Sequence, residues 1–294
     1  MNTDTPRQGS HTGSAARVPA ADPGPWAAIR TVADAARQRL PLLWWSGWAA
    51  LALSLPLLVL ALTTEATLNG VSVWVKPWKF HVSVGLHLLT LAWFAALLPS
   101  TPARQRALSR MGALAVVCAV LELAYIVWRA SRGEASHFNV GTPVAATLYG
   151  LMGLGAVLLT ACAGWLGWHI GRSQDFPHGP VLQRGLAVGL VLGCVLGTLA
   201  GAYLSAQTGH WVGGSLSDAQ GLPVLGWSRD GGDLRVAHFF GLHAMQVLPV
   251  LAWLAARQLP TTAARRAVDA AALAWVLLTG LAFAQALRGQ PFLG

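Results

Sequence analysis

Residues 185–206 read GLAVGLVLGCVLGTLAGAYLSA, a stretch without a charged side chain. A helix of about 20 mostly apolar residues is long enough to cross a bilayer, so the stretch predicts a membrane span. Five glycines recur in it at every fourth position: Gly185, Gly189, Gly193, Gly197 and Gly201. Small residues on one helix face let a neighbouring helix approach closely, where van der Waals contact stabilises the pair in lipid. We therefore expect tight packing along this face; the alternative is a surface on which two helices slide or hinge.

The rest of the chain repeats this apolar pattern. Of its 294 residues, 54% are hydrophobic and 11% are charged, whereas about a quarter of the residues in a soluble domain are charged. Seven segments qualify as spans by length and apolarity: 41–63, 80–99, 108–130, 145–170, 184–206, 234–257 and 264–288. The sequence thus predicts an all-α membrane protein, with a seven-helix transmembrane domain over residues 41–288 embedded in the lipid bilayer.

Basic residues set the predicted orientation, because cytoplasmic loops carry an excess of Lys and Arg. With the N-terminus inside, thirteen of the 20 Lys and Arg residues lie on the cytoplasmic side and seven lie outside. We expect a cytoplasmic N-terminus, an extracytoplasmic C-terminus and a place in a bacterial inner membrane. Residues 1–40 form the predicted cytoplasmic tail. Residues 1–25 have the composition of a disordered chain, and residues 26–40 predict an amphipathic helix on the membrane surface.

The basic charge and the cysteines exclude two other classes of protein. The net charge of +9 does not indicate nucleic-acid binding, because the basic residues fall in short clusters between apolar segments. The three cysteines, Cys118, Cys162 and Cys194, lie inside apolar segments and form no CxxC pair. We expect them to be packing residues rather than a disulfide or a thiolate metal site.

Polar residues gather on the predicted outer side, which holds six of the nine histidines: His81, His87, His137, His210, His238 and His243. Because a helix rises 1.5 Å per residue, His87 and Glu122 each lie about 10 Å below the outer rim, and His243 lies about 12 Å below it. Gln246 lies one turn below His243 on the same helix face. An ionisable group inside a membrane is costly and indicates a functional site with a nearby partner. For Glu122 the candidate partners are His87, His243 and Arg129, and a buried ion pair with Arg129 is the structural alternative.

Basic residues flank the same helix ends, although basic residues are scarce on the outer side of membrane proteins. They are Lys76, Lys79, Arg129, Arg132 and Arg235. We interpret them as a joint site for an anionic group; the alternative is interfacial residues whose charges reach the lipid headgroups. Residues 207–233, between the fifth and sixth spans, predict a lid over this site. Loops of such length are functional or disordered, and Trp211 and Trp227 argue against disorder.

Three motifs carry a resemblance to known proteins: KPWKF at 76–80, SHFN at 136–139 and GDLRVAHFFGLHAMQ at 232–246. With them the chain resembles a family of uncharacterised bacterial multi-pass integral membrane proteins, over about residues 70–260. The resemblance implies membership and no activity. The chain differs from rhodopsins, because its seventh span has no lysine that could carry a retinal. It also differs from di-haem cytochrome b bundles, whose histidine ligands lie toward both membrane faces, because here the candidate histidines lie only on the outer side.

The leading functional hypothesis is a redox or metal-dependent membrane protein. His87 and His243, at similar depth, suit the two axial ligands of one b-type haem. The haem propionates would then meet the basic group, which consists of Lys76, Lys79, Arg129, Arg132 and Arg235. Alternatively, Zn, Fe or Cu is bound by imidazoles and a carboxylate: His81, His87, Glu122, His238 and His243. The spacing of these histidines along each helix favours one ligand per helix.

Three other functions stay open. One is a transporter or channel for a small anion or proton-coupled solute, in which Glu122 and the histidines relay protons. Another is an enzyme on a lipid-linked or phosphorylated substrate, with Glu122, His137 and His238 as candidate catalytic residues. The last is a sensor or assembly factor that does no chemistry. The sequence leaves the ligand and the oligomeric state undetermined.

Overall fold

The structure, a computed structural model, describes Met1 and residues 24–294 and consists of helices with two short two-stranded ribbons. The helices are α1 (Gly24–Arg39), α2 (Pro41–Thr63), α3 (Val75–Ala96), α4 (Pro102–Ser131), α5 (Pro143–Arg172), α6 (Pro180–Ser205), α7 (Leu234–Gln258) and α8 (Thr261–Leu287). The ribbons pair β1 (Thr67–Leu68) with β2 (Val71–Ser72) and β3 (Trp211–Val212) with β4 (Gly232–Asp233), both antiparallel. The disorder predicted for residues 1–25 falls almost wholly outside the described residues.

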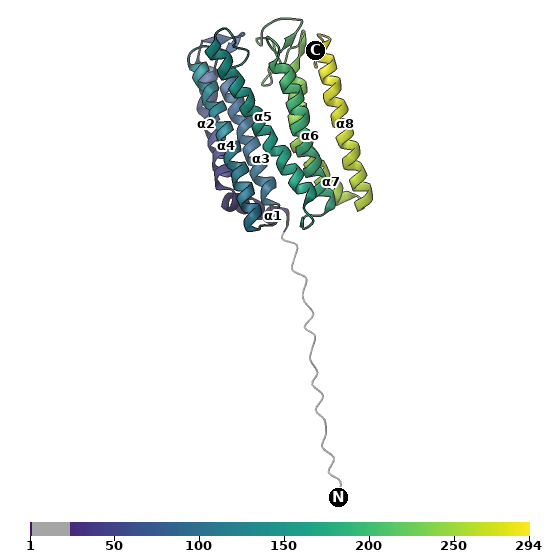
Figure 1. The fold of residues 1–294 in the computed structure, drawn as a ribbon. Coiled ribbons are helices and arrows are strands. Elements are labelled where there is room, and N and C mark those ends of the chain that lie inside the picture. The colour runs from purple at the N-terminus through teal and green to yellow at the C-terminus, as the bar shows by residue number, and fades with distance from the viewer. Residues whose placement is uncertain (2–23) are drawn as a thin grey trace.

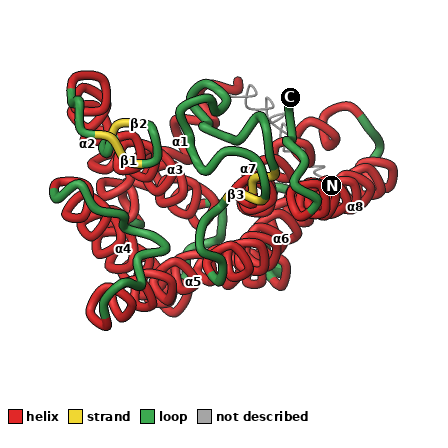
Figure 2. Tube along the Cα trace, turned by 90° about the horizontal axis from the view of Figure 1, so that it is seen from above, coloured by secondary structure: helices red, strands yellow, loops and turns green. Residues whose placement is uncertain are grey.

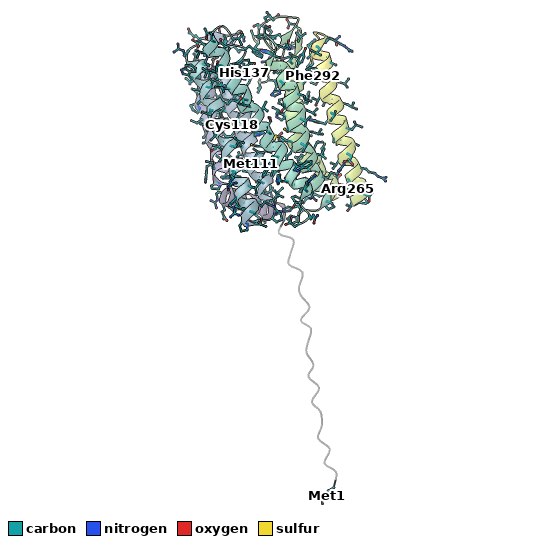
Figure 3. All side chains as sticks on the ribbon, in the orientation of Figure 1. Met1, Met111, Cys118, His137, Arg265 and Phe292 are labelled. Atoms are coloured by element: carbon teal, nitrogen blue, oxygen red, sulfur yellow. The ribbon has the colours of Figure 1, made fainter. Side chains whose placement is uncertain are left out.

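Helices α2 to α8 run up and down side by side, whereas α1 lies across one end of the bundle (Figure 1). The opposite end carries the two ribbons and the C-terminus, and we call it the loop end. Figure 3 shows His137 and Phe292 near the loop end and Arg265 near the α1 end. The chain therefore enters and leaves the bundle at opposite ends.

Each of the seven predicted spans falls on one of the helices α2 to α8, and six of these helices are long and apolar enough to cross a membrane. The described residues thus form an all-α fold of the multi-pass membrane type. The exception is α3, which carries Lys76, Lys79, His81 and His87 and has no stretch that is both long and apolar enough. It packs against α1, α2, α4 and α5, so protein rather than lipid surrounds much of its surface.

Local sequence signals explain where several helices begin. Pro41, Pro102, Pro143 and Pro180 each open a helix, where a missing N–H costs no helical hydrogen bond. Thr101 caps α4, because its hydroxyl accepts a hydrogen bond from the Arg104 N–H at 3.2 Å. Such caps satisfy backbone groups that the first turn leaves unpaired.

The glycine face of α6 packs directly against α7. A Cβ atom added at Gly189 would lie 2.8 Å from the Ala244 carbonyl oxygen, and one at Gly193 would lie 3.0 Å from Met245 Cβ. At Gly201 the nearest neighbour is the His238 ring, whose Nδ1 bonds the Gly197 carbonyl oxygen at 2.9 Å. The predicted close packing is therefore confirmed, and the same glycine face positions a candidate site histidine.

The bundle divides into two groups of helices that meet along α5 and α6 (Figure 2). Helices α1 to α5 form one group and α6 to α8 form the other. The largest apolar core lies mainly in the first group and includes Leu91, Leu108 and Leu166. Leu186 and Leu190 of α6 and Met245 of α7 join it from the second group. Of the predicted amphipathic face on α1, Ala36 and Leu40 are buried in this core, whereas Trp26 is 74% exposed.

The segment between α6 and α7 crosses from one group to the other at the loop end. Its two ends pair as β3 and β4. Its middle reaches the turn between β1 and β2, where the Asp218 N–H donates to the Asn69 carbonyl oxygen at 2.8 Å. Trp227 is buried against Val236 of α7 and Ala282 of α8, with Phe239 and Phe292 alongside. The segment is thus a packed structure; its role as a lid stays a prediction.

Candidate functional site

The predicted basic residues at the loop end are mostly neutralised by carboxylates. Arg129 pairs with Glu134 at 2.7 Å, and Arg132 pairs with the same carboxylate at 3.5 Å. Arg235 binds Asp218 at 2.8 Å and Asp233 at 2.7 Å. The ion pair considered between Glu122 and Arg129 is therefore wrong. The carboxylate of Glu134, in the loop five residues after Arg129, forms the ion pair with this guanidinium instead of Glu122.

The two lysines of α3 have different surroundings. Lys79 donates from Nζ to the Leu225 carbonyl oxygen at 3.0 Å and so contacts the α6–α7 segment. Lys76 lies over the Phe80 ring at 5.8 Å and interacts electrostatically with Glu122, Asp218 and Arg235. Within residues 24–294, the Lys76 ammonium has no hydrogen-bond acceptor and no ion-pair partner. Of the five predicted basic residues, Lys76 and Lys79 make no ion pair in this part of the chain, and Lys76 alone also lacks a hydrogen-bond acceptor there.

The SHFN motif forms a compact turn that holds His137 inside the bundle. The Arg129 Nε–H and the Asn139 amide both donate to the Ala135 carbonyl oxygen, at 3.3 and 3.1 Å. Phe138 adopts a left-handed backbone with φ of 59°, which costs energy in a bulky residue and persists only where the surroundings enforce it. His137 packs edge-on against Phe80 of α3 at 5.4 Å. Burial, and then the positive charge of Lys76, hold the pKa of His137 well below its usual 6.5.

The histidines of α3 and α7 share one mode of attachment. The Nδ1 atoms of His81 and His243 each lie within hydrogen-bonding distance of the carbonyl oxygen four residues earlier, at 2.8 and 2.7 Å. The Nδ1 atom of His238 lies 2.9 Å from the Gly197 carbonyl oxygen. When Nδ1 carries the proton and donates it to a carbonyl, Nε2 becomes the acceptor, which is the state that binds metals.

Three buried polar atoms lack a partner in the interior of the bundle. They are His87 Nε2 on α3, Tyr125 Oη on α4 and Gln246 Oε1 on α7. The carboxyl of Glu122, itself 7% exposed, also has no hydrogen-bond donor among the described residues. An unpaired buried polar group costs about 1–3 kcal/mol. Such groups in one protein interior indicate a place for water or a ligand.

Electrostatic interactions connect the predicted site residues into a chain of neighbours. His87 interacts with His243, and His243 interacts with His238. His137 interacts with both His238 and Lys76, and Lys76 interacts with Glu122. The fold therefore brings together residues of α3, α4, α7 and the α4–α5 turn, which we call the polar cluster: Lys76, His87, Glu122, His137, His238 and His243. His81 interacts with none of them within the described chain.

The predicted metal site is not assembled. In the part of the chain that the structure describes, no three His, Cys, Asp or Glu side chains lie close enough to hold a metal ion. The described structure therefore does not bring His81, His87, Glu122, His238 and His243 together as a metal site, and this set stays a prediction. The Nδ1 bonds of His81, His238 and His243 fix these three rings to different points of the backbone.

The residues fit a b-type haem by the chemistry of their donors. His87 offers a buried Nε2 without a partner. His243 has its Nδ1 attached to the Phe239 carbonyl oxygen and its ring stacked on Phe239 at 3.8 Å, which leaves Nε2 for coordination. Two apolar grooves, of about 300 and 390 Å³, lie elsewhere, between α5 and α6.

Sequence reasoning missed Tyr125 and the triad of His210, Asp218 and Arg235. Tyr125 follows Glu122 by three residues and so lies near it on the helix face, a relation that the spacing could have indicated. The triad could not have been found from the sequence. His210 Nε2 lies 3.1 Å from Asp218 Oδ1, and this contact depends on how the whole α6–α7 segment folds.

Comparison with protein-family models, with curated proteins and with solved structures finds no match to this chain. The family resemblance that the three motifs suggest therefore stays a prediction.

Proposed function

We propose that this chain is a seven-span protein of a bacterial inner membrane, with α1 on the cytoplasmic side and the loop end outside. In this proposal α3 also crosses the membrane, which brings the number of spans from six to seven. Its polar side chains are compatible with a span because α1, α2, α4 and α5 surround it. The course of the chain supports an odd number of crossings, since α1 and the C-terminus lie at opposite ends (Figure 1).

Fusions test this orientation. Alkaline phosphatase, which is active only outside the cytoplasm, is placed after Gly294 or within the α6–α7 segment, and green fluorescent protein is placed at the same points. We expect phosphatase activity without fluorescence at both points. Fluorescence at the C-terminus would contradict the seven-span proposal.

We further propose that the polar cluster binds a redox cofactor, a b-type haem, through the Nε2 atoms of His87 and His243. The observation that carries this proposal is the buried His87 Nε2 atom without a hydrogen-bond partner on α3, within electrostatic reach of His243 on α7. Bound haem would supply one-electron transfer. The Phe239 carbonyl oxygen holds the His243 ring by its Nδ1 atom. The fold places the free ammonium of Lys76 near the loop end, where it complements an anionic substituent.

The position of the polar cluster in the bundle determines from which side of the membrane a partner can reach it. Buried apolar residues, among them Leu91, Leu108 and Leu166, fill the bundle toward the α1 end. The polar cluster lies nearer the loop end, where the α4–α5 turn contributes His137 (Figure 3). A partner that exchanges electrons or a ligand with the cluster would therefore approach from outside.

The absorption spectrum of the purified protein tests the haem proposal. We expect a Soret band from protein produced with a haem supply, and its loss in both His87→Ala and His243→Ala. The matched control is His81→Ala, which removes a buried imidazole from the same helix outside the polar cluster. A spectrum without a Soret band, or equal loss in all three variants, contradicts the proposal.

A proton-coupled anion transporter is the second candidate, and one observation favours it. The Glu122 carboxyl is buried without a hydrogen-bond donor among the described residues and interacts with the uncompensated Lys76 ammonium. A carboxyl in such a position could exchange a proton as an anion arrives at Lys76. Uptake of small anions into proteoliposomes under a pH gradient, lost in Glu122→Gln and kept in Asp175→Asn, would support this function. Uptake by the Glu122→Gln variant at the normal rate would contradict it.

A further inference from the structure

The surface groove near the α1 end, between α5 and α6, is a candidate binding site independent of the polar cluster. The groove has a volume of about 390 Å³. Gly167 and Gly171 line it from α5, Val191 and Leu192 line it from α6, and Trp168 and Arg172 close its end. These residues belong to two of the helices that qualify as membrane spans, so the groove opens onto the surface that such helices present to lipid.

The depth of the groove follows from its glycines. A Cβ atom at Gly167 would lie 2.7 Å from Leu190 Cβ, and one at Gly171 would lie 3.1 Å from Ala187 Cβ. The two helices therefore touch along this line, and the groove runs along the outer side of the contact. A second groove of about 300 Å³, lined by Val157, Val195 and other residues, continues along the same pair of helices toward the loop end.

The length of this line suits a lipid chain. Residues 157 and 172 are fifteen residues apart on α5, which corresponds to about 22 Å along a helix. Half of the hydrocarbon core of a bilayer measures about 15 Å. One acyl chain can therefore lie along the two grooves while its headgroup stays at the level of Arg172.

Charge selects the kind of lipid. The Arg172 guanidinium lies 4.0 Å over the Trp168 ring, at the last residue of α5. Two other arginines of the α1 end are already paired, Arg104 with Asp175 and Arg184 with Asp269. Arg172 makes no ion pair within the described residues, so its charge is available to a phosphate. Basic pockets between helices on the cytoplasmic side are a recurrent way of holding anionic lipids.

We propose that this groove binds an anionic phospholipid, with its phosphate at Arg172 and one acyl chain between Gly167 and Val191. The zwitterionic lipids of the same bilayer would fill the groove more weakly, because they add no net charge for Arg172 to attract. The bound lipid would cover the seam at which the two groups of helices meet.

Native mass spectrometry of the detergent-purified chain, titrated with phosphatidylglycerol or phosphatidylcholine, tests the proposal. We expect the wild-type chain to bind phosphatidylglycerol more tightly, and Arg172→Gln to weaken this binding about fivefold, the effect of about 1 kcal/mol for one basic residue at a membrane surface. Arg257→Gln is the matched control, because Arg257 lies 4.3 Å over Trp253 near the end of α7 and lines neither groove. It should leave binding unchanged.

A second variant tests the groove itself. Val191→Trp fills the groove while keeping Arg172, and we expect it to weaken binding of both lipids. Equal affinity of the wild-type chain for the two lipids, or equal effects of Arg172→Gln and Arg257→Gln, overturns the proposal. The arginine variants decide the outcome even where Val191→Trp does not fold, since Arg172 is exposed and its substitution leaves the core intact.

Discussion

Arg235, in the first turn of α7, donates to Asp218 Oδ1 over 2.8 Å and so fastens the middle of the α6–α7 segment to the bundle. Asp218 also contacts His210 Nε2 at 3.1 Å and, through its backbone N–H, the Asn69 carbonyl oxygen. Burial alone would raise the pKa of this carboxyl, but His210 and Arg235 hold the pKa below its usual 3.8. Asp218 therefore joins α7, the β1–β2 turn and the segment that crosses between them.

Asp218→Asn should loosen the α6–α7 segment without unfolding the helices. The substitution removes the charge from a mostly buried ion pair, while Arg235 keeps its contact with Asp233. We expect a loss of about 1–3 kcal/mol of local stability and faster limited proteolysis between residues 213 and 231. Asp175→Asn, which breaks an exposed pair with Arg104 at the α1 end, is the control. A cleavage rate equal to that of the wild-type chain would show that Asp218 does not hold the segment.

Stability should fall as the pH decreases below about 6.5. Burial lowers the pKa of both His210 and His137 in the folded chain, so the unfolded chain binds protons more readily than the folded one below the unfolded value. The stability that depends on these neutral imidazoles is complete above that pH and is lost on acidification. We expect the thermal midpoint in detergent to decrease between pH 7.5 and 5, and to decrease less in His210→Gln. His169→Gln, at the α1 end, is the control. A thermal midpoint that decreases with pH as steeply in His210→Gln as in the wild-type chain would exclude His210 as a source of the pH dependence.

The helices could be predicted from the sequence because apolar length and proline positions are local signals. The proximity of His87 and His243 agrees with their similar depth, since a helix converts residue number into distance. Glu122 lies at a similar depth but interacts with Lys76. The partners of the charges could not be predicted. Glu134 and Asp218 lie in loops, and which arginine each one meets depends on the folded path of those loops. The mutual arrangement of the five residues predicted as a metal site could not be predicted either, because depth says nothing about the direction in which each ring is held.

The contact between α6 and α7 gives a prediction about stability. Gly189→Ala places a Cβ atom 2.8 Å from the Ala244 carbonyl oxygen and 2.9 Å from Pro249 Cδ, so the two helices must separate. We expect a loss of about 1–3 kcal/mol, typical of overpacking. Gly155→Ala on α5 is the matched control, because its added methyl group meets no atom within 4 Å. The thermal midpoints of the two variants in the same detergent provide the measurement, and a Gly189→Ala midpoint equal to that of Gly155→Ala would contradict close packing.

Glu122 and Glu134 should behave oppositely when each is changed to Gln. Arg129 is 8% exposed and depends on the Glu134 carboxylate at 2.7 Å, so Glu134→Gln leaves a buried guanidinium without its counter-charge. We expect a loss of roughly 1–3 kcal/mol, below the 3–5 kcal/mol of a fully buried pair because Glu134 is partly exposed.

Glu122 has no donor among the described residues, so Glu122→Gln should leave the thermal midpoint unchanged or raise it, since it removes a buried ionisable group. A midpoint that falls as much in Glu122→Gln as in Glu134→Gln would mean that Glu122 serves the fold. An unchanged midpoint together with a lost ligand or transport signal assigns Glu122 to function, and Arg129→Gln, which should match Glu134→Gln, completes the comparison.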